Sequence, residues 1–591
     1  MKTGSESATT HPRATGPHFP LAHRPAEAAE PSLAPSAAPH LWFERAALVK
    51  AVAAGIVAWI VLELLFLAFV HRDLEGDAHR AFLPGDALGV GLREAAAGYR
   101  PVSQIGYDGQ LYYTISNDLL GWYDAAAHLD NVVYRYQRIG IPALAGGLAT
   151  LLGYDLTPPM LFHTLNLGLT AAGFGGLVYW LLIHQLRTAL ALGWLLSIGT
   201  LQSLCRGLLD APADALFVLM MLALLARRLW VYLPLAVLLL LTREMYALVA
   251  AGVFVVTACQ RFPWRDVSGY WQRVALTAAP GAVMLGWMLY LSLHFDQSPF
   301  ASREAPGFTS YPFYAMYKAV AGFVATGNWT QAWPAVATAA MLLVAIVGLA
   351  ANVRRLPWAL VCAIPYVLMC ASLGPAQWLE YQGSTRIMNV SIVLGLLLMP
   401  FDKSIFLPAV VALQALLGVT LTAETRLASS VIVARELVHE REGIPLLPPE
   451  APTNSLLNEP RCRIAWIDAA PVCRRRYDGI WNAVHRELRP VAVAVTNLTD
   501  VTWHPGHAPR EIWLQYRLYD ASYQSPRFLA RHAVLLDQEI PPGETRTITT
   551  YLELRRPGRK YAVEFTLWQE GPGAFDEHDP QNGGRYEFRV E

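Results

Sequence analysis

One short string near the start of the chain combines a carboxylate with glycines and tyrosines: Gly106-Tyr107-Asp108-Gly109-Gln110-Leu111-Tyr112-Tyr113. An aspartate in such a string can accept the proton of a hydroxyl group. Flanking glycines let the backbone approach a substrate closely, and tyrosine rings suit both sugar faces and membrane interfaces. The string therefore favours chemistry on a sugar, with Asp108 as the base. The alternative is a surface turn at Asp108-Gly109 with interface tyrosines beside it.

Arginines stand at the borders of several hydrophobic segments that follow: Arg135, Arg138, Arg206, Arg243 and Arg386. Charge at membrane depth is costly, so such residues usually face an interior cavity and have partners. Acidic candidates lie nearby in the sequence, namely Asp210, Asp214 and Glu244. Two interpretations stay open. The arginines form internal ion pairs, for which Arg243–Glu244 is the best candidate, or they hold a phosphate in the forked geometry that guanidinium groups favour.

A metal ion has weak support in the sequence. Asp108 together with Asp210 or Asp214 offers the oxygen ligands that a divalent cation such as Mg²⁺ or Mn²⁺ prefers, but nothing in their spacing requires one. The sequence contains no P-loop, no Rossmann glycine fingerprint and no Gly-x-Ser-x-Gly elbow. These absences disfavour a cytosolic enzyme that uses a nucleotide sugar. The formal net charge of +0 argues against a nucleic-acid partner.

Long hydrophobic stretches must position these residues. The chain has 591 residues, of which 54% are hydrophobic and 16% charged, whereas a soluble protein carries roughly 25% charged residues. We expect a polytopic α-helical membrane protein with about eleven spans. The expected spans are residues 47–70, 159–184, 188–206, 211–226, 229–242, 244–260, 275–294, 333–351, 357–374, 385–401 and 404–422. The run 139–153 is short for a span and is expected not to cross.

Basic residues between the spans set the expected orientation. With the N-terminus inside, Arg187, Arg227, Arg265, Arg354 and Lys403 fall on the cytoplasmic side, in agreement with the positive-inside rule. Residues 1–42, rich in Ala, Pro and Ser, are expected to be a disordered cytoplasmic segment. The transmembrane domain is expected over 43–425, with the loops 71–138 and 296–332 and the C-terminal part outside the cytoplasm.

The C-terminal part follows a different pattern. A linker is expected over 426–486, and from 487 to 591 hydrophobic residues alternate, with turn signals such as Pro541-Pro542-Gly543 between about seven short strands. We expect an extracytoplasmic, all-β immunoglobulin-like sandwich. This sandwich either stabilises the protein or orients an acceptor glycan through Trp503, Trp513 and Trp568. The second interpretation requires that these tryptophans do not belong to the core of the sandwich.

Two cysteines in this external part, Cys462 and Cys473, are able to pair in an oxidising compartment. The sequence alone leaves their pairing open, because it does not give the Cα spacing that a disulfide needs.

The order of these features resembles the GT-C superfamily, the integral-membrane glycosyltransferases that use polyprenyl-phosphate-linked sugars. The resemblance spans roughly residues 45–425 and rests on five elements: the Tyr107-Asp108-Gly109-Gln110 string, Tyr134-Arg135-Tyr136-Gln137-Arg138, Asp210-Ala211-Pro212, Leu241-Thr242-Arg243-Glu244 and Ser384-Thr385-Arg386. It implies a catalytic acidic residue in the first external loop, here Asp108, and a lipid-phosphate donor that enters from the bilayer. Many members carry paired acids in that loop, whereas this chain has Gly106 and Gln110 there. A second acid would have to come from Asp210 or Asp214.

These observations lead to one expected function and two alternatives. We expect an inner-membrane glycosyltransferase that moves a sugar from a polyprenyl-phosphate donor to an extracytoplasmic glycan or glycolipid acceptor in cell-envelope polysaccharide assembly. Asp108 is the expected base. The remaining candidate substrate-binding residues are Tyr107, Gly109, Gln110, Tyr112, Tyr113, Arg135, Arg138, Arg206, Asp210, Asp214, Arg243, Glu244 and Arg386. The alternatives are a transporter or flippase for a lipid-linked glycan, and a non-catalytic scaffold for envelope assembly.

Overall fold

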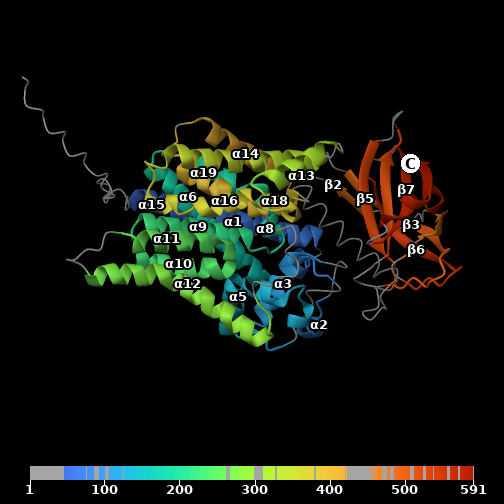
Figure 1. Ribbon diagram of the computed structural model, residues 1–591, viewed down its shortest axis with the longest axis horizontal. Coiled ribbons are helices and arrows are strands. Elements are labelled where there is room, and N and C mark those ends of the chain that lie inside the picture. The colour runs from blue at the N-terminus through green and yellow to red at the C-terminus, as the bar shows by residue number, and fades with distance from the viewer. Residues whose placement is uncertain are drawn as a thin grey trace, which may run out of the picture. The chain divides into compact units, whose positions relative to one another are not determined.

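The computed structural model of the chain is mostly helical, with a β-sheet region at its C-terminal end (Figure 1). It describes residues 45–421 and 454–589, apart from gaps at 75, 86–91, 100–105, 124, 261–266, 299–309, 326–328, 379–380, 403, 420, 456, 458, 469–474, 479–484, 506–511, 523–526, 537, 555–558 and 570–572. The expected segment 1–42 and the Pro-rich stretch of the expected linker lie outside the described residues. The helical region and the β-sheet region are each treated by themselves below.

Helices of very different lengths make up the first region. The longer ones are α1 (Arg45–Asp73), α6 (Pro159–Ile183), α9 (Asp210–Leu225), α10 (Leu229–Thr242), α11 (Ala247–Ala258), α12 (Val267–Phe295), α13 (Tyr314–Ala325) and α14 (Trp329–Asn352). The shorter ones are η2 (Ala78–Phe82), α2 (Leu92–Ala96), α3 (Asp108–Asn117), η3 (Ala125–His128), α4 (Val132–Tyr136), α5 (Gly140–Leu151), η4 (Thr188–Ala191), α7 (Leu192–Leu195), α8 (Ile198–Cys205), η5 (Glu244–Tyr246), α15 (Trp358–Val361), α16 (Ile364–Ala371), α17 (Pro375–Trp378), α18 (Tyr381–Ile387) and α19 (Val390–Leu398).

Four of the described helices, α1, α6, α12 and the 332–352 part of α14, are long and apolar enough to cross a membrane. A fifth span results if the bent pair 188–195 and 198–205 is counted as one. The apolar helices indicate a membrane protein. The remaining expected spans coincide with helices of 10–17 residues, such as α10 and α11. By helix length the described residues therefore contain fewer spans than the expected number of about eleven.

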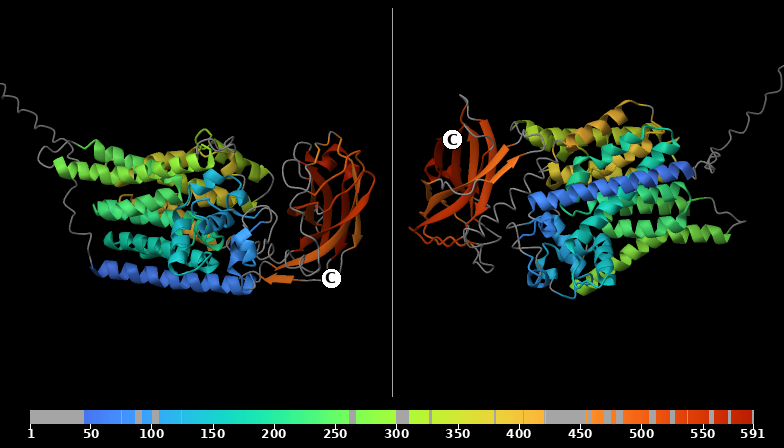
Figure 2. Two further views of the ribbon diagram at one scale, coloured as in Figure 1. Left: turned by 90° about the horizontal axis from the view of Figure 1, so that it is seen from below. Right: turned by 180° about the vertical axis from the view of Figure 1, so that it is seen from behind.

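Helix α1 runs along the outside of the helical region (Figure 2, blue). Many of its large apolar side chains are exposed, including Val49, Val57 and Leu65. An exposed apolar face of this size on a long helix suits the hydrocarbon core of a bilayer, which offers no hydrogen-bonding partners. This face therefore indicates contact with lipid.

Helices α1 and α6 approach each other at small residues. A Cβ atom on Gly55 would lie 3.2 Å from the carbonyl oxygen of Ala171, and one on Gly175 would lie 3.0 Å from that of Ala51. Each helix thus presents an alanine and a glycine four residues apart. This small-residue spacing is typical of membrane helices that pack backbone against backbone.

Two stretches deviate from straight spanning helices. The stretch 188–206 is bent by 54° between α7 and α8, where the Ser197 hydroxyl accepts a hydrogen bond from the backbone N–H of Thr200 at the start of α8. The run 139–153 forms only the twelve-residue helix α5. At 1.5 Å per residue α5 is about 18 Å long, which is shorter than about 30 Å of hydrocarbon, and α10 and α11 are of similar length.

The β-sheet region consists of two antiparallel sheets. The first contains β1 (Cys462–Asp468), β2 (Arg475–Asp478), β3 (His485–Asn497) and β6 (Thr545–Leu554); β1 and β2 pair with one edge of β3, and β6 pairs with the other. The second has the order β5 (Arg527–Leu535), β4 (Ile512–Asp520), β7 (Lys560–Gln569), β8 (Gly573–Ala574), with β9 (Gly584–Arg589) also paired to β7.

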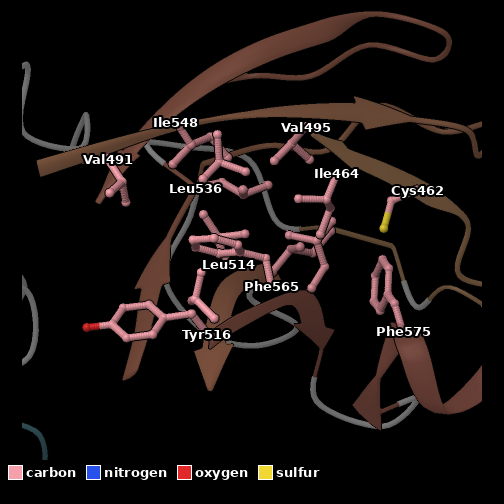
Figure 3. Packing of buried hydrophobic residues seen from close by; sticks show 14 of the residues in the cluster. Cys462, Ile464, Val491, Val495, Leu514, Tyr516, Leu536, Ile548, Phe565 and Phe575 are labelled. Atoms are coloured by element: carbon pink, nitrogen blue, oxygen red, sulfur yellow. The ribbon is translucent and has the colours of Figure 1, made fainter. Parts of the chain in front are cut away.

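One apolar core joins the two sheets (Figure 3). Alternate residues of each strand point into it, so that Val491, Val493 and Val495 of β3 face Leu514 and Tyr516 of β4. Trp503 is fully buried in the same core. It is therefore a core residue and not a surface platform.

Cys462 is a free, buried thiol at the start of β1. Its sulfur donates to the carbonyl oxygen of Asn582 at 3.1 Å. Cys473 lies outside the described residues, and the structure gives Cys462 no disulfide partner among those that it describes.

Candidate functional site

Asp108 is the first residue of α3, and its neighbours explain why the helix begins there. Gly106 has a φ of 78°, a left-handed value that favours glycine. Tyr107 is extended, and its backbone N–H donates to the carbonyl oxygen of Leu83 at 3.1 Å. The chain therefore turns into the helix at Asp108, whose carboxylate lies at the positive end of the helix dipole.

Gly109 fixes the position of α3 against the end of α8. A methyl group at position 109 would overlap the carbonyl oxygen of Arg206, the residue that follows α8. Only glycine lets the two backbones come this close. Asp108 and Arg206, almost one hundred residues apart in the chain, are thereby held in neighbouring positions.

Two arginines from other elements contact the Asp108 carboxylate. One oxygen lies 3.1 Å from a guanidinium nitrogen of Arg135, and the other lies 3.5 Å from one of Arg386. Arg135 comes from α4 and Arg386 from α18. In Figure 1, α3 and α18 lie at the same end of the helical region. The Asp108 side chain is nevertheless 34% exposed, so it remains open to a further molecule.

The arginines control the protonation of Asp108. Burial alone would raise the pKa of this carboxyl group, but the positive charges of Arg135 and Arg386 outweigh that effect and lower the pKa to about 2. Asp108 is therefore ionised at neutral pH. As long as both arginines stay paired with it, it is also a weak base.

Arg206 is a buried cation that stacks on a ring. Its guanidinium carbon lies 4.2 Å from the centre of the Tyr107 ring, and that of Arg386 lies 5.4 Å from the same ring. The Nε atoms of both arginines are buried and without a hydrogen-bond partner in the described part of the chain. Tyr107 is held in place by the side-chain amide of Gln202, which donates to its hydroxyl at 3.2 Å.

Arg135 and Arg138 have acidic partners of their own. Arg135 makes a two-pronged contact with Asp130, at 2.8 and 2.5 Å. Arg138 makes the same kind of contact with Glu244, at 2.9 and 2.6 Å. Arg138 also donates to the hydroxyl of Tyr112 at 2.8 Å. Bidentate contacts of this kind fix a guanidinium group firmly.

The expected pair Arg243–Glu244 is not formed. Glu244 pairs with Arg138, and Arg243 forms an ion pair with Asp210. A second arginine, Arg386, approaches the other oxygen of Asp210 at 4.0 Å. Adjacent residues at a helix end point in different directions, so each of them finds a partner on another element. Arg386 thus stands between two carboxylates, those of Asp108 and Asp210.

Asp214 lies one helical turn further along α9 and has neutral partners. Its two oxygens accept hydrogen bonds from the hydroxyl of Tyr246 at 2.6 Å, from the side-chain amide of Asn389 at 2.7 Å and from the indole N–H of Trp194 at 3.4 Å. These donors come from three different parts of the helical region. Asp214 therefore ties helices together rather than facing the arginines.

Tyr113 and Gln110 also serve the scaffold. Tyr113 is fully buried, donates to the carbonyl oxygen of Thr157 at 2.8 Å and stacks on Phe82 with ring centres 4.7 Å apart. The side-chain oxygen of Gln110 accepts from the backbone N–H of Gly85. Both residues follow Asp108 on the face of α3 that is turned into the protein.

The described residues contain no group of three or more His, Cys, Asp or Glu side chains placed to hold a metal ion. The carboxylates of Asp108 and Asp210 are paired with arginines, whose positive charges would repel a divalent cation. Their donor set consequently does not favour Mg²⁺ or Mn²⁺.

The sequence prediction missed several residues that build the site. Asp130 and Tyr134 hold Arg135 and Arg138, Gln202 holds Tyr107, and Asn389 and Tyr246 hold Asp214. Asp130 has a local signal, because it lies five residues before Arg135. The other residues make contacts between helices that are distant in the sequence, and no pattern in a single sequence predicts such contacts.

We compared the chain with protein-family models, with curated proteins and with solved structures, and none of the three comparisons gives a match.

Proposed function

We propose that the protein is a membrane glycosyltransferase that moves a sugar from a polyprenyl-phosphate donor to a glycan or glycolipid acceptor. One observation carries this proposal: a partly exposed carboxylate, Asp108, touches Arg135 and Arg386 beside a further buried cation, Arg206. A base next to a concentration of guanidinium groups suits a reaction that takes a proton from a hydroxyl and leaves negative charge on a phosphate.

The charges around Asp108 favour an anionic ligand. We call Arg135, Arg138, Arg206, Arg243 and Arg386 the arginine cluster. Asp130, Glu244 and Asp210 each bind one member closely, and Asp108 shares Arg135 and Arg386. Among the described residues Arg206 has no carboxylate within ion-pair distance, and its positive charge is in excess. A phosphodiester, with its single negative charge, would balance that excess.

The proposed reaction keeps the charge of the site constant. The acceptor hydroxyl gives its proton to Asp108, and its oxygen forms a bond to the anomeric carbon of the sugar. The bond from that carbon to the phosphate oxygen breaks, and its electron pair stays on the lipid phosphate, which gains one negative charge. Asp108 loses one at the same time. Arg386, which lies 3.5 Å from Asp108 in the free protein, pairs with the phosphate of the bound donor and balances the charge that the phosphate gains.

Binding of the donor should also activate the base. A phosphate that draws Arg386 towards itself removes one of the charges that keep the pKa of Asp108 low. The pKa then rises towards its ordinary value, and Asp108 becomes a better proton acceptor. Tyr107, which is half-buried and stacks with Arg206, lies beside the arginine cluster and is the tyrosine placed to contact the sugar, whereas Tyr112 is buried.

The proposed setting is the inner membrane, with the N-terminus in the cytoplasm and about eleven spans. Shorter apolar helices of 10–17 residues would cross where the bilayer is locally thin or as broken pairs. The C-terminal region would be an extracytoplasmic immunoglobulin-like sandwich. Exposed loop aromatics such as Tyr311 and Trp329 would form an interface belt or the rim of the acceptor site.

A transfer assay tests this proposal. Membrane vesicles or nanodiscs that contain the purified protein receive a polyprenyl-phosphate sugar with radiolabel in the sugar, together with a glycolipid extract as acceptor. We expect label in the acceptor fraction with wild-type protein, none with Asp108→Asn and normal transfer with Asp155→Asn, an exposed aspartate used as control. Movement of intact labelled lipid between leaflets, without transfer of the sugar, would instead indicate a flippase. If the protein neither transfers the sugar nor moves the lipid, the result would indicate a scaffold.

A further inference from the structure

Three aromatic side chains stack along one face of α12, in its C-terminal half. They are Trp287, Tyr290 and His294, whose spacing of three and four residues places them on the same face of the helix. The ring centres of Trp287 and Tyr290 are 5.1 Å apart and those of Tyr290 and His294 are 5.4 Å apart, and the ring planes of these pairs differ by only 21° and 8°. We call these three residues the aromatic ladder.

Each ring of the aromatic ladder also reaches a main-chain carbonyl oxygen of the connection between α3 and α5 (residues 118–139), which contains α4. The three hydrogen bonds run from the indole N–H of Trp287 to Tyr136 at 2.8 Å, from the hydroxyl of Tyr290 to Leu120 at 2.9 Å, and from Nε2 of His294 to Gly121 at 3.1 Å. Tyr136 is the last residue of α4, where carbonyl groups lack a partner within the helix. The aromatic ladder supplies this partner from another helix.

Apolar contacts hold the α3–α5 connection against α12 as well. Leu291, which follows Tyr290, is fully buried in a cluster with Val133 and Tyr136 of α4. The hydroxyl of Tyr136 donates to the carbonyl oxygen of Asp118 at 2.7 Å, so two distant parts of the connection are also tied to each other. The connection is thus a packed unit that rests on α12.

This connection carries two members of the arginine cluster. Arg135 and Arg138 stand one residue before and two residues after Tyr136, the residue whose carbonyl group Trp287 binds. Both guanidinium groups form ion pairs with carboxylates of other elements. A shift of the main chain at Tyr136 would therefore move both guanidinium groups at once.

Helix α12 is built in a way that allows its C-terminal half to shift. Pro280 stands inside the helix and has no N–H for the hydrogen bond to the carbonyl group of Leu276 that a regular helix would form. A Cβ atom on Gly281 or Gly286, which lie between Pro280 and the aromatic ladder, would meet no neighbouring atom within 4 Å. The helix is therefore loosely packed before the aromatic ladder and firmly bound at it.

We propose that Trp287 and Tyr290 are positioning residues. Through the aromatic ladder they fix the main chain that carries Arg135 and Arg138, and so raise the affinity of the arginine cluster for a lipid phosphate. The identity of this ligand rests on the proposed function. The coupling between α12 and the α3–α5 connection does not, because it follows from the contacts alone.

Hydrogen exchange of main-chain amides, measured by mass spectrometry on the full-length protein in nanodiscs without ligand, tests the coupling. Trp287→Phe keeps an aromatic ring and removes the N–H. We expect the amides of residues 132–138 to exchange about three- to tenfold faster in this variant, as for the loss of one hydrogen bond, and those of α9 to exchange as in wild type. Trp271→Phe, the same substitution at an exposed tryptophan near the start of α12, should change neither.

Tyr290→Phe sharpens this test, because its hydroxyl binds a different part of the connection. Faster exchange should then appear at residues 118–123, around the carbonyl group of Leu120. Unchanged exchange of residues 132–138 in Trp287→Phe would overturn the proposal, and so would an equal increase in Trp271→Phe.

Binding of decaprenyl phosphate, which carries no sugar to transfer, tests the effect on the arginine cluster. Its dissociation constant should rise about three- to tenfold in Trp287→Phe, again as for one lost hydrogen bond, and should stay unchanged in Trp271→Phe. In the transfer assay the KM for the sugar donor should rise by the same factor with little change in kcat, whereas partial unfolding would lower the apparent kcat and leave KM unchanged.

The two measurements also separate this proposal from the proposed function. Faster exchange with unchanged binding of decaprenyl phosphate would overturn the positioning role of Trp287. If the wild-type protein bound no decaprenyl phosphate, the proposed function would fail, and the exchange results alone would still confirm or reject the coupling.

Discussion

Two neighbouring parts of the helical region give their carboxylates different partners. One part lies around the starts of α3 and α9, and the other lies one turn further along α9. In the first part Asp108 and Asp210 face guanidinium groups. In the second part Asp214 faces a hydroxyl, an amide and an indole N–H, all neutral. Asp210 and Asp214 are only four residues apart on one helix. The difference shows that the position of a carboxylate relative to the arginine cluster, and not its distance along the chain, decides whether its partners are charged or neutral.

Asp108→Asn should give the largest effect. The amide cannot accept the proton of an acceptor hydroxyl, and loss of a general base typically lowers kcat by about 10²–10⁴-fold. Initial rates of sugar transfer measure this loss. Expression and thermal unfolding should stay close to wild type, as for the Asp155→Asn control. Transfer by Asp108→Asn within tenfold of wild type would remove Asp108 from the reaction.

Arg206→Gln tests the excess charge of the arginine cluster. A charge-assisted hydrogen bond contributes about 1.5–3 kcal/mol, so the KM for the lipid donor should rise about 10–100-fold. Donor titrations at saturating acceptor measure it. Arg354→Gln removes an exposed arginine outside the cluster and should leave KM unchanged. If both variants raise KM equally, general electrostatic attraction to the membrane explains the effect.

Asp214→Asn should sharpen the contrast, because it acts on stability. The new amide keeps only one acceptor oxygen, so either Asn389 and Trp194 or the hydroxyl of Tyr246 is left without an acceptor. We expect a loss of about 1–3 kcal/mol in the free energy of unfolding, seen as a lower thermal midpoint in detergent, with the KM for the donor unchanged. A raised KM at normal stability would instead place Asp214 at the substrate.

The pH dependence should show the smallest and most specific effect. The lowered pKa of Asp108 means that its ion pairs stabilise the fold above pH 4, near the ordinary pKa of a carboxyl group, and that this contribution is lost only as the pH falls towards about 2. The profile of kcat/KM for the donor, which reports the free enzyme, should therefore show no acid limb from Asp108 above about pH 4.

The profile of kcat should behave differently, because the bound phosphate competes with Asp108 for Arg386. Its acid limb should lie at higher pH than that of kcat/KM. Arg386→Gln should raise the limb of kcat/KM as well, since it removes one of the charges that lower the pKa. Identical limbs in both profiles would contradict the exchange of arginine partners.

Much of the arrangement around Asp108 was accessible from sequence, and the reason is physical. Charge is scarce in a hydrophobic chain, so Arg135, Arg206 and Arg386 attract notice by residue type alone, and costly charges must find partners. Their partners were less accessible. The contact of Arg138 with Glu244 joins residues 106 positions apart, and it depends on how the turn between α4 and α5 lies against η5.

In the fold, too, some features could be predicted from the sequence and others could not. Alternation of hydrophobic residues indicates strands such as β4 and β7, because one face of each sheet is buried. Hydrophobicity marks the apolar helices too, but it does not reveal where a segment breaks. The bend after α7 arises at Ser197, whose hydroxyl starts a new helix, and such local competition with the backbone shortens helices without lowering hydrophobicity. The number of spans counted from hydrophobic segments is consequently larger than the number of long helices.

The contact between Gly109 and the carbonyl oxygen of Arg206 has a consequence for inhibitor design. It fixes the backbones that carry Asp108 and Arg206 relative to each other, so the main chain of this part of the site needs little reorganisation when a ligand arrives. A rigid molecule that spans both groups, such as a phosphonate fused to a basic iminosugar, would lose little freedom on binding. Resistance by substitution of Gly109 would be difficult, because any side chain there would force the two backbones apart.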